Sequence, residues 1–273
     1  MTPLPPPAVS SFLRKLVFDC SAIVLDERKD YLLQARLGPL LDREGLRSWD
    51  DLVDKLHAPF ALGLRQRVIE AMTTHETSFF RDQHPFDALR AQVFPRLFTE
   101  RPRGTINVWS AAASSGQEIY SIAFLATELA AARDVQFRLL ATDISAEILG
   151  RAKEGRFSQL EVNRGLPAPH LVRHFERNGL EWRVKEPIRR MIDFRLLNLI
   201  EPWPPVPDMD VVFLRNVLIY FDVPTKRRIL ERLASVMRPR AILFLGAVES
   251  TLNLCDRFLP ITLGKAMAFE RLA

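Results

Sequence analysis

Polar side chains that could bind a charged small molecule follow several apolar segments of this 273-residue chain. Asp143, Asn198 and the pair Arg215-Asn216 each come directly after one such segment, and another leads into Ala111–Gly116, a turn of small residues. A carboxylate in this setting can accept hydrogen bonds from ribose hydroxyls, and small side chains let a ligand approach the backbone closely. The chemistry indicated is recognition of a nucleotide or nucleoside.

These residues have to be positioned by alternating strands and helices. Apolar, partly β-branched runs predict strands at Thr105–Ser110, Gln136–Thr142, Met191–Leu197, Asp208–Leu214 and Ala241–Leu245. Apolar residues at helical spacing predict helices at Gln117–Ala132, Ile144–Lys153 and Pro224–Met237, and a final hairpin is predicted at Ile261–Leu263 and Ala266–Arg271. This order predicts an α/β sheet, mostly parallel with one antiparallel edge, whose ligand sits at the carboxyl ends of the strands.

The nucleotide signal is incomplete when it is taken alone. The turn holds one glycine, Gly116, where a dinucleotide fingerprint has three. Asp143 also lies further along the chain than the roughly twenty residues that the fingerprint expects. The alternative is a parallel-sheet crossover whose turn is tight for packing reasons only.

The residues before the sheet predict a separate helical domain. Residues 11–75 carry apolar positions at helical spacing in four segments: Ser11–Phe18, Arg28–Arg43, Ser48–Leu56 and Pro59–Met72. Residues 1–10 hold four prolines within the first seven positions, which predicts a flexible, extended tail. Residues 76–103 are then expected to link the helical domain to the sheet.

One stretch at the start of that linker is unusual. In TTHETSFFR, polar residues crowd against Phe79 and Phe80, and burial of these two rings would hold Arg81 stiffly. A stiff arginine suits the recognition of a carboxylate, because it can donate two parallel hydrogen bonds. The alternative is an interdomain elbow with a surface arginine.

Residues 155–190 predict a small antiparallel insertion. Turn residues interrupt the helical pattern, and Asn178-Gly179 between VRHFER and LEWRVKE is a strong hairpin signal. Residues 151–195 hold eleven Lys/Arg and six Asp/Glu, a local net charge of +5 that equals the net charge of the whole chain. Such a surface suits an acidic partner, either protein or nucleic acid, although it can also be an ordinary solvated surface.

Several function classes are disfavoured by the sequence. No run of eighteen apolar residues occurs, and the N-terminus lacks the basic start and apolar core of a secretory signal, so we expect no membrane insertion and a cytoplasmic location. The five histidines are scattered and show no metal-ligand spacing, so no metal is expected.

Five segments resemble the motifs of one family. They are HETSFFRD, AAASSGQEIYSIA, LLATDIS, FLRNVLIYFD and LFLGAVES. In order and spacing, from about Ser11 to the C-terminus, the chain resembles the CheR family of chemotaxis receptor methyltransferases. The resemblance implies a class I S-adenosylmethionine-dependent methyltransferase fold with a Rossmann-like sheet at 104–273, a small helical N-terminal domain and an inserted β-subdomain. It also implies methylation of glutamates in the cytoplasmic helical region of chemotaxis receptors, giving glutamate 5-O-methyl esters and S-adenosylhomocysteine.

The resemblance carries the family's site onto particular residues. The expected cofactor-binding residues are His75, Thr77, Arg81, Glu118, Asp143, Asn198, Leu199, Arg215 and Asn216. Arg81 and Tyr220 match the two side chains that act near the transferred methyl group. The chain departs from the family pattern where His75 replaces an asparagine, where Gln117 replaces an acid, and where the turn is richer in alanine.

The chemistry agrees with these residue types. A carboxylate nucleophile is already ionised at pH 7, so methyl transfer to it needs no general base and depends on positioning and partial desolvation. A non-catalytic module that binds S-adenosylmethionine or S-adenosylhomocysteine to regulate a partner is the second hypothesis. A nucleic-acid methyltransferase is disfavoured, because no Asn-Pro-Pro-Tyr type motif is present to hold a flipped base. The hairpin lacks a long glycine-rich loop, so we expect no docking on a pentapeptide receptor tail, and the oligomeric state stays open.

Overall fold

The computed structural model describes residues 3–131 and 133–273. Its residues form two compact units. The first contains residues up to Thr74 together with Tyr220–Thr225, and the second contains His75–Ile219 and Lys226–Ala273.

The first unit is a small helical bundle, as predicted. Its elements are α1 (Pro7–Ser21), the 3₁₀ turn η1 (Glu27–Lys29), α2 (Asp30–Arg43), α3 (Trp49–His57) and α4 (Leu62–Met72). One side chain from each helix, Leu13, Leu37, Leu52 and Val68, is completely buried in a shared apolar cluster. Ser48 begins α3, because its side chain accepts a hydrogen bond from the amide of Asp51 at 3.1 Å.

The N-terminal segment differs from the predicted flexible tail. Helix α1 begins at Pro7, a residue type favoured in the first turn of a helix because it has no amide hydrogen to leave unpaired. The segment before it is also held in place, because the indole of Trp49 donates a hydrogen bond to the carbonyl of Pro3 at 2.9 Å. The four prolines predicted an extended chain, but they could not indicate the hydrogen bond between Trp49 and Pro3.

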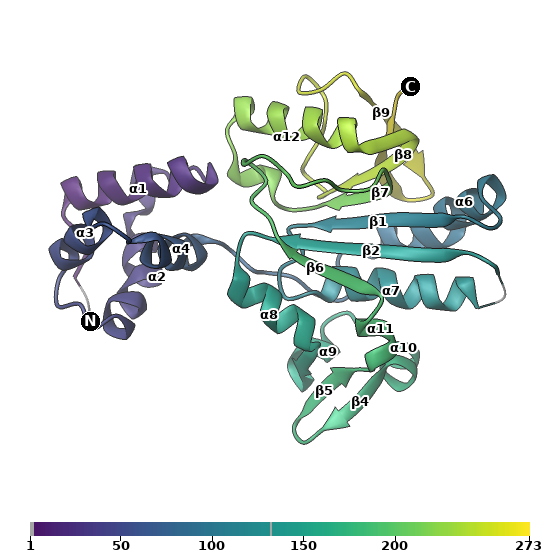
Figure 1. Cartoon of the computed structure of the whole chain (residues 1–273), viewed down its shortest axis with the longest axis horizontal. Coiled ribbons are helices and arrows are strands. Elements are labelled where there is room, and N and C mark those ends of the chain that lie inside the picture. Colours follow the sequence, from purple (N-terminus) through teal and green to yellow (C-terminus); the bar gives the residue numbers. More distant parts are fainter. Residues whose placement is uncertain (1–2, 132) are drawn as a thin grey trace. The chain divides into compact units, whose positions relative to one another are not determined.

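The second unit is built on a seven-stranded sheet in the order β6-β2-β1-β7-β8-β10-β9 (Figure 1). The strands are β1 (Thr105–Ala111), β2 (Gln136–Asp143), β6 (Ile192–Leu196), β7 (Met209–Leu214), β8 (Met237–Leu245), β9 (Phe258–Leu263) and β10 (Ala266–Arg271). The first five pair in parallel, and β10 runs antiparallel between β8 and β9. This confirms a mostly parallel sheet with an antiparallel edge.

Helices cover this sheet. They are α5 (His84–Ala88), the π-helical turn η2 (Leu89–Val93), α6 (Phe94–Glu100), α7 (Gln117–Ala130), α8 (Ala146–Glu154) and α12 (Val223–Val236), with the 3₁₀ turn η3 (Leu218–Tyr220) before α12. Side chains of β1 alternate between the two faces. Ile106 and Val108 lie in the large core cluster that includes α7, whereas the ring of Trp109 lies edge-on to Trp203, with centroids 5.1 Å apart.

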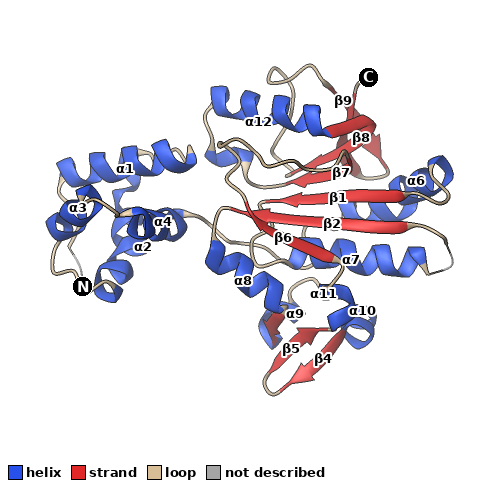
Figure 2. Cartoon of the chain, viewed as in Figure 1, coloured by secondary structure: helices blue, strands red, loops and turns tan. Residues whose placement is uncertain are grey.

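The insertion forms a separate three-stranded antiparallel sheet in the order β3-β5-β4. Its strands are β3 (Arg156–Ser158), β4 (Phe175–Asn178) and β5 (Glu181–Val184), and Figure 2 shows β4 and β5 away from the main sheet. Asn178 is the last residue of β4, so the hairpin turn is Gly179-Leu180, one residue later than the Asn-Gly signal suggested. Three short helices accompany the strands and were not predicted: α9 (Gln159–Asn163), α10 (Ala168–His174) and α11 (Glu186–Arg189).

Within the described part of the chain, no helix is both long enough and apolar enough to cross a membrane.

A buried carboxylate fixes the register of the two central strands at the end opposite to the expected site. Asp210 of β7 is 1% exposed and accepts a hydrogen bond from the amide of Asn107 in β1 at 2.8 Å. The same carboxylate pairs with the guanidinium groups of Arg101 and Arg238. Its removal would leave a buried amide and a cluster of positive charge without an acceptor.

We therefore predict that Asp210→Ala lowers the free energy of unfolding by about 3 kcal/mol, because breaking a buried ion pair from one side costs about 3 to 5 kcal/mol. Chemical denaturation followed by circular dichroism measures this change. The matched control is Asp208→Ala, whose side chain is 69% exposed. Equal stability of the two variants would contradict the structural role of Asp210.

Candidate functional site

The turn after β1 has an unusual backbone. Ala112, Ser114 and Gly116 have φ values of 64°, 52° and 94°, which lie in the left-handed region. A side chain at Gly116 would also be crowded, since its Cβ would lie 3.1 Å from the Cβ of Ala152 and 3.2 Å from the ring of Tyr120. The glycine therefore permits both the positive φ and the close packing of the turn on α8 and α7.

Asp143 holds this turn against the end of β2. One carboxylate oxygen, Oδ2, accepts a hydrogen bond from the amide of Ser114 at 2.9 Å, and Oδ1 accepts one from the amide of Ser145 at 3.1 Å. The amide of Ile144 also donates to this carboxylate. An ionised carboxylate offers about four acceptor positions, so about one remains for a ligand. Burial raises the pKa of Asp143, and the hydrogen bonds from these amides oppose that rise.

Two further hydrogen bonds connect the segments that carry His75 and Asn198 to Asp143 and to the turn that it holds. The hydroxyl of Ser114 donates to the carbonyl of His75 at 3.0 Å, and the amide of Leu197 donates to the carbonyl of Asp143 at 2.9 Å. The second bond places Asn198 and Leu199 directly after a residue that is bonded to Asp143. Leu199 is buried, and the amide group of Asn198 donates to Glu201 at 3.2 Å. His75, Asp143, Asn198 and Leu199 thus belong to one connected set of segments.

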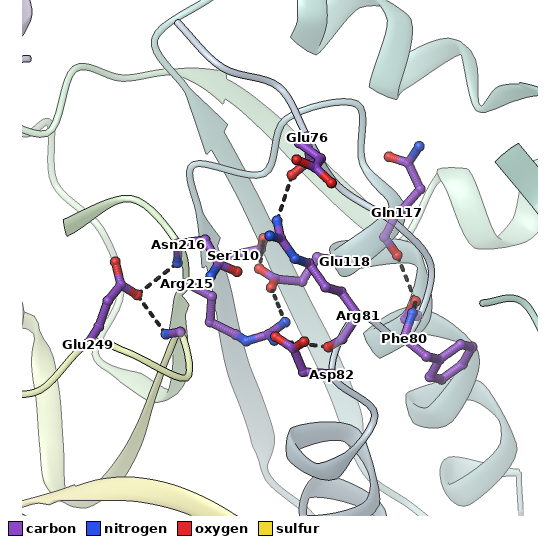
Figure 3. Close-up of polar contacts among 12 residues, drawn as sticks. Glu76, Phe80, Arg81, Asp82, Ser110, Gln117, Glu118, Arg215, Asn216 and Glu249 are labelled. Carbon is purple, nitrogen blue, oxygen red and sulfur yellow. Dashed lines mark hydrogen bonds and ion pairs between the residues drawn. The ribbon is translucent and has the colours of Figure 1, made fainter. Parts of the chain in front are cut away.

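A second set is organised by the buried side chain of Arg215, as Figure 3 shows. Its guanidinium is 2% exposed and pairs with Glu118 at 3.1 Å and with Asp82 at 2.6 Å. It also donates to the carbonyl of Arg81 at 2.9 Å. The other oxygen of Glu118 accepts a hydrogen bond from the hydroxyl of Ser110 at 2.8 Å. The end of β7, the start of α7 and the segment that carries Arg81 are therefore joined by one cation.

The segment around Arg81 is also fixed by its two aromatic residues. Phe79 is completely buried, and its ring meets the ring of Phe157 at 5.0 Å. The amide of Phe80 donates to the hydroxyl of Ser121 in α7 at 3.0 Å. Among the described residues, the one hydrogen bond of the Arg81 guanidinium goes to the carbonyl of Glu76 in its own loop, at 2.7 Å. The backbone of Arg81 is thus held firmly, and its side chain keeps donors for another acceptor.

A third carboxylate orders the backbone that follows β7. Glu249 accepts hydrogen bonds at Oε2 from the amides of Asn216 at 2.8 Å and Gly246 at 2.6 Å (Figure 3). It also accepts one from the amide of Ile219 at 3.2 Å. Asn216 has a φ of 57°, a conformation that asparagine tolerates better than most residues. A Cβ on Gly246 would lie 2.9 Å from the backbone nitrogen of Asn216, so the close approach of the two strand ends requires glycine there.

Two predicted site residues are less constrained by these contacts. Thr77 is partly buried in the segment between His75 and Arg81. Tyr220 ends η3 and belongs to the other compact unit, so its role in the site stays a prediction.

Sequence reasoning missed three residues that position the others: Asp82, Ser110 and Glu249. Asp82 and Glu249 lie in the quoted segments HETSFFRD and LFLGAVES, and Ser110 ends the first predicted strand. Charge balance could have indicated Asp82, because an arginine buried at a strand end requires acidic partners.

The arrangement suits a polar ligand whose hydroxyl groups donate to a carboxylate and whose acceptor groups pair with an arginine. A buried carboxylate with a spare acceptor position and a turn of small residues follow two parallel strands. A firmly placed arginine, Arg81, comes from the segment before α5.

Comparison with known proteins defines the class. Residues 75–266 match the family model described as the CheR methyltransferase, SAM binding domain, and residues 11–73 match the CheR methyltransferase, all-alpha domain. The sheet and these matches together define a class I S-adenosylmethionine-dependent methyltransferase.

The chain belongs to the CheR methyltransferase family. It is 38% identical over 253 residues to the chemotaxis protein methyltransferase Cher2 of Pseudomonas putida, with 91% of this chain and 92% of that protein covered. It is 40% identical over 241 residues to chemotaxis protein methyltransferase 1 of Pseudomonas aeruginosa, with coverage of 86% and 88%. The corresponding protein 1 of Vibrio cholerae is 38% identical over 252 residues, with 90% of each chain covered.

We predict that Asp143→Ala weakens S-adenosylmethionine binding by about 1 to 3 kcal/mol, or about 5- to 150-fold, because charge-assisted hydrogen bonds to the ribose are lost. Isothermal titration calorimetry measures the affinity. Asp193→Ala is the matched control, because Asp193 lies on the neighbouring strand β6 with a side chain that is 55% exposed. An unchanged affinity in Asp143→Ala would exclude this carboxylate from the cofactor site.

Proposed function

We propose that this protein transfers the methyl group of S-adenosylmethionine to glutamate side chains in the cytoplasmic helical region of chemotaxis receptors. The products are glutamate 5-O-methyl esters and S-adenosylhomocysteine. Membership of the CheR methyltransferase family and similarity to chemotaxis protein methyltransferases support the reaction class and the receptor substrate.

The observation that carries the proposal is the hydrogen bond between Ser114 and the carbonyl of His75. Ser114 belongs to the turn that Asp143 holds, and His75 begins the segment that ends in Arg81. A carboxylate suited to ribose hydroxyls and an arginine suited to a substrate carboxylate therefore lie on directly connected backbone. A methyl donor and its acceptor have to meet in such a site.

The residues present fit S-adenosylmethionine. Asp143 has about one spare acceptor position for a ribose hydroxyl, and the small turn Ala111–Gly116 allows the cofactor to approach the backbone. The other residues proposed to bind the cofactor are His75, Thr77, Glu118, Asn198, Leu199, Arg215 and Asn216. When bound, the cofactor supplies a methyl group on a positively charged sulfur.

The residues of this chain contribute positioning. In our proposal Arg81 holds the substrate carboxylate with its free donors, and Tyr220 orients a reactant through its hydroxyl. A carboxylate is ionised at pH 7, so no residue has to remove a proton. Glu118 and Asp82 act through Arg215, because they neutralise the cation that fixes the backbone of Arg81.

The basic insertion is the part of the second unit best suited to an acidic surface on the receptor, because residues 151–195 carry a net charge of +5. Its hairpin turn is the two-residue Gly179-Leu180. Independence from a pentapeptide receptor tail stays a prediction of the sequence.

The proposal is tested by incubating the purified protein with radiolabelled S-adenosylmethionine and purified receptor cytoplasmic fragments. We expect label in the receptor as a base-labile ester. We also expect Arg81→Ala to lower turnover by about 100-fold, as removal of one positioned donor does in other sites. Receptor binding should fall much less, because Arg81 is one of many contacts.

Arg138→Ala is the control for Arg81→Ala, because Arg138 is an exposed arginine on β2. Arg81→Ala should keep its fold, since the contact with Arg215 uses the backbone carbonyl. Tight cofactor binding without any base-labile ester would instead favour the second hypothesis, a non-catalytic signalling module. Unaltered methylation by Arg81→Ala would remove this side chain from the site.

A further inference from the structure

A cluster of three ligand-type side chains lies outside the cofactor site. Glu128 comes from α7, and His170 and His174 come from successive turns of α10 in the insertion. Nδ1 of His170 lies 3.4 Å from Oε1 of Glu128, and Nε2 of His174 lies 3.6 Å from the same oxygen. The three potential ligand atoms all lie within 4.8 Å of one another.

The two imidazole nitrogens are buried without a hydrogen-bond partner. His170 is 8% exposed and His174 is 3% exposed, and neither nitrogen meets hydrogen-bond geometry with Glu128. Both rings are held by stacking: His174 on Phe124 with centroids 4.6 Å apart, and His170 on Phe80 at 4.9 Å. A buried polar atom without a partner costs free energy, so two of them aimed at one carboxylate require an explanation.

We propose that Glu128, His170 and His174 bind a divalent transition-metal ion of the zinc class. Zn²⁺ binds imidazole nitrogen and carboxylate oxygen at about 2.0 to 2.2 Å, so two ligand atoms of a tetrahedral site lie about 3.3 Å apart. The observed separations of 3.4 and 3.6 Å are close to this value. Two histidines four residues apart on one helix face form a common pair of zinc ligands, and a water molecule can take the fourth position.

The electrostatics of the cluster suit neutral imidazole ligands. Burial lowers the pKa of both histidines, so each ring is neutral at pH 7 and keeps a lone pair for a metal. The guanidinium of Arg173 lies 3.0 Å from Oε1 of Glu128, and Arg90 also contributes positive charge near His170. Arg173 therefore competes with the metal for the carboxylate, but its side chain is 64% exposed and can turn into solvent.

A metal ion here would link the insertion, through α10, to helix α7 of the main sheet. Helix α10 precedes β4, and α7 lies under the main sheet and begins beside Arg215. Because Phe80 stacks on His170 and precedes Arg81 in the chain, the ion would also restrain the segment that positions Arg81. No metal was expected from the sequence, because the four-residue spacing of His170 and His174 was overlooked and because the third ligand, Glu128, comes from a different helix.

The test uses the full-length protein after treatment with a chelator and removal of the chelator. Titration with Zn²⁺ by calorimetry should give one site per chain with micromolar or tighter affinity. Co²⁺ should give the intense visible absorption of a tetrahedral complex with nitrogen ligands. His174→Gln and Glu128→Gln should each weaken Zn²⁺ binding by more than about 100-fold, because even substitutions in the outer shell of a metal site cost about 10- to 100-fold.

Two further variants test whether Zn²⁺ binding is specific to this cluster. His57→Gln is the control, because His57 is an exposed histidine in the first unit and should leave binding unchanged. Arg173→Gln removes the competing cation and should tighten Zn²⁺ binding severalfold. Thermal unfolding of each metal-free variant checks that it folds. If His174→Gln does not fold, the Co²⁺ spectrum of the wild type and the Zn²⁺ titration of Arg173→Gln still test whether the metal site exists.

Millimolar Zn²⁺ binding by the wild type, or an octahedral Co²⁺ spectrum without nitrogen ligands, would overturn the proposal. Binding that is equally weakened by His57→Gln would overturn it as well. None of these readouts uses methyl transfer, so the metal site and the proposed enzymatic function can fail separately.

Discussion

The site depends on one guanidinium that is taken out of water. An arginine cannot lose its charge in a protein, so burial of Arg215 requires fixed acceptors around it. Glu118, Asp82 and the carbonyl of Arg81 provide them from α7 and from the segment before α5. If one of these elements moved away, the buried cation would lose one of its three acceptors. The place of Arg81 in the fold therefore follows from the electrostatics of a different arginine.

Side-chain carboxylates that accept hydrogen bonds from backbone amides connect several strands and turns of this sheet. Asp143 joins the turn after β1 to the start of α8, and Glu249 joins the ends of β7 and β8. Asp210 joins β1 and β7 at their other end. Parallel strands present amide groups at their ends that the sheet ladder does not pair, and a negatively charged side chain is the strongest acceptor for them. Asp143 and Glu249 thus stabilise the fold and also shape the edge at which the ligand site is proposed.

Much of the fold could be predicted because the main strands are long, apolar and separated by helices of clear periodicity. Asp143, Asn198 and Arg215 could be placed at one edge of the sheet, because parallel strands end on the same side. The helices α9, α10 and α11 could not, because four to seven residues are too few to show a period. The partners Asp82 and Glu249 were missed because ion pairs and amide contacts join residues distant in sequence. The anchored Pro3 was missed for the same reason, since it depends on Trp49.

The alanine-rich turn has an evolutionary consequence. Ala112 in a left-handed conformation costs about 1 to 2 kcal/mol in the folded state, whereas glycine would avoid that cost but lose about 0.5 to 1 kcal/mol more conformational entropy on folding. The two costs partly cancel, so alanine at this position lowers the stability by at most about 1.5 kcal/mol relative to glycine. A domain with a stability of about 5 to 15 kcal/mol tolerates that loss, and a missing glycine fingerprint is therefore weak evidence of lost function.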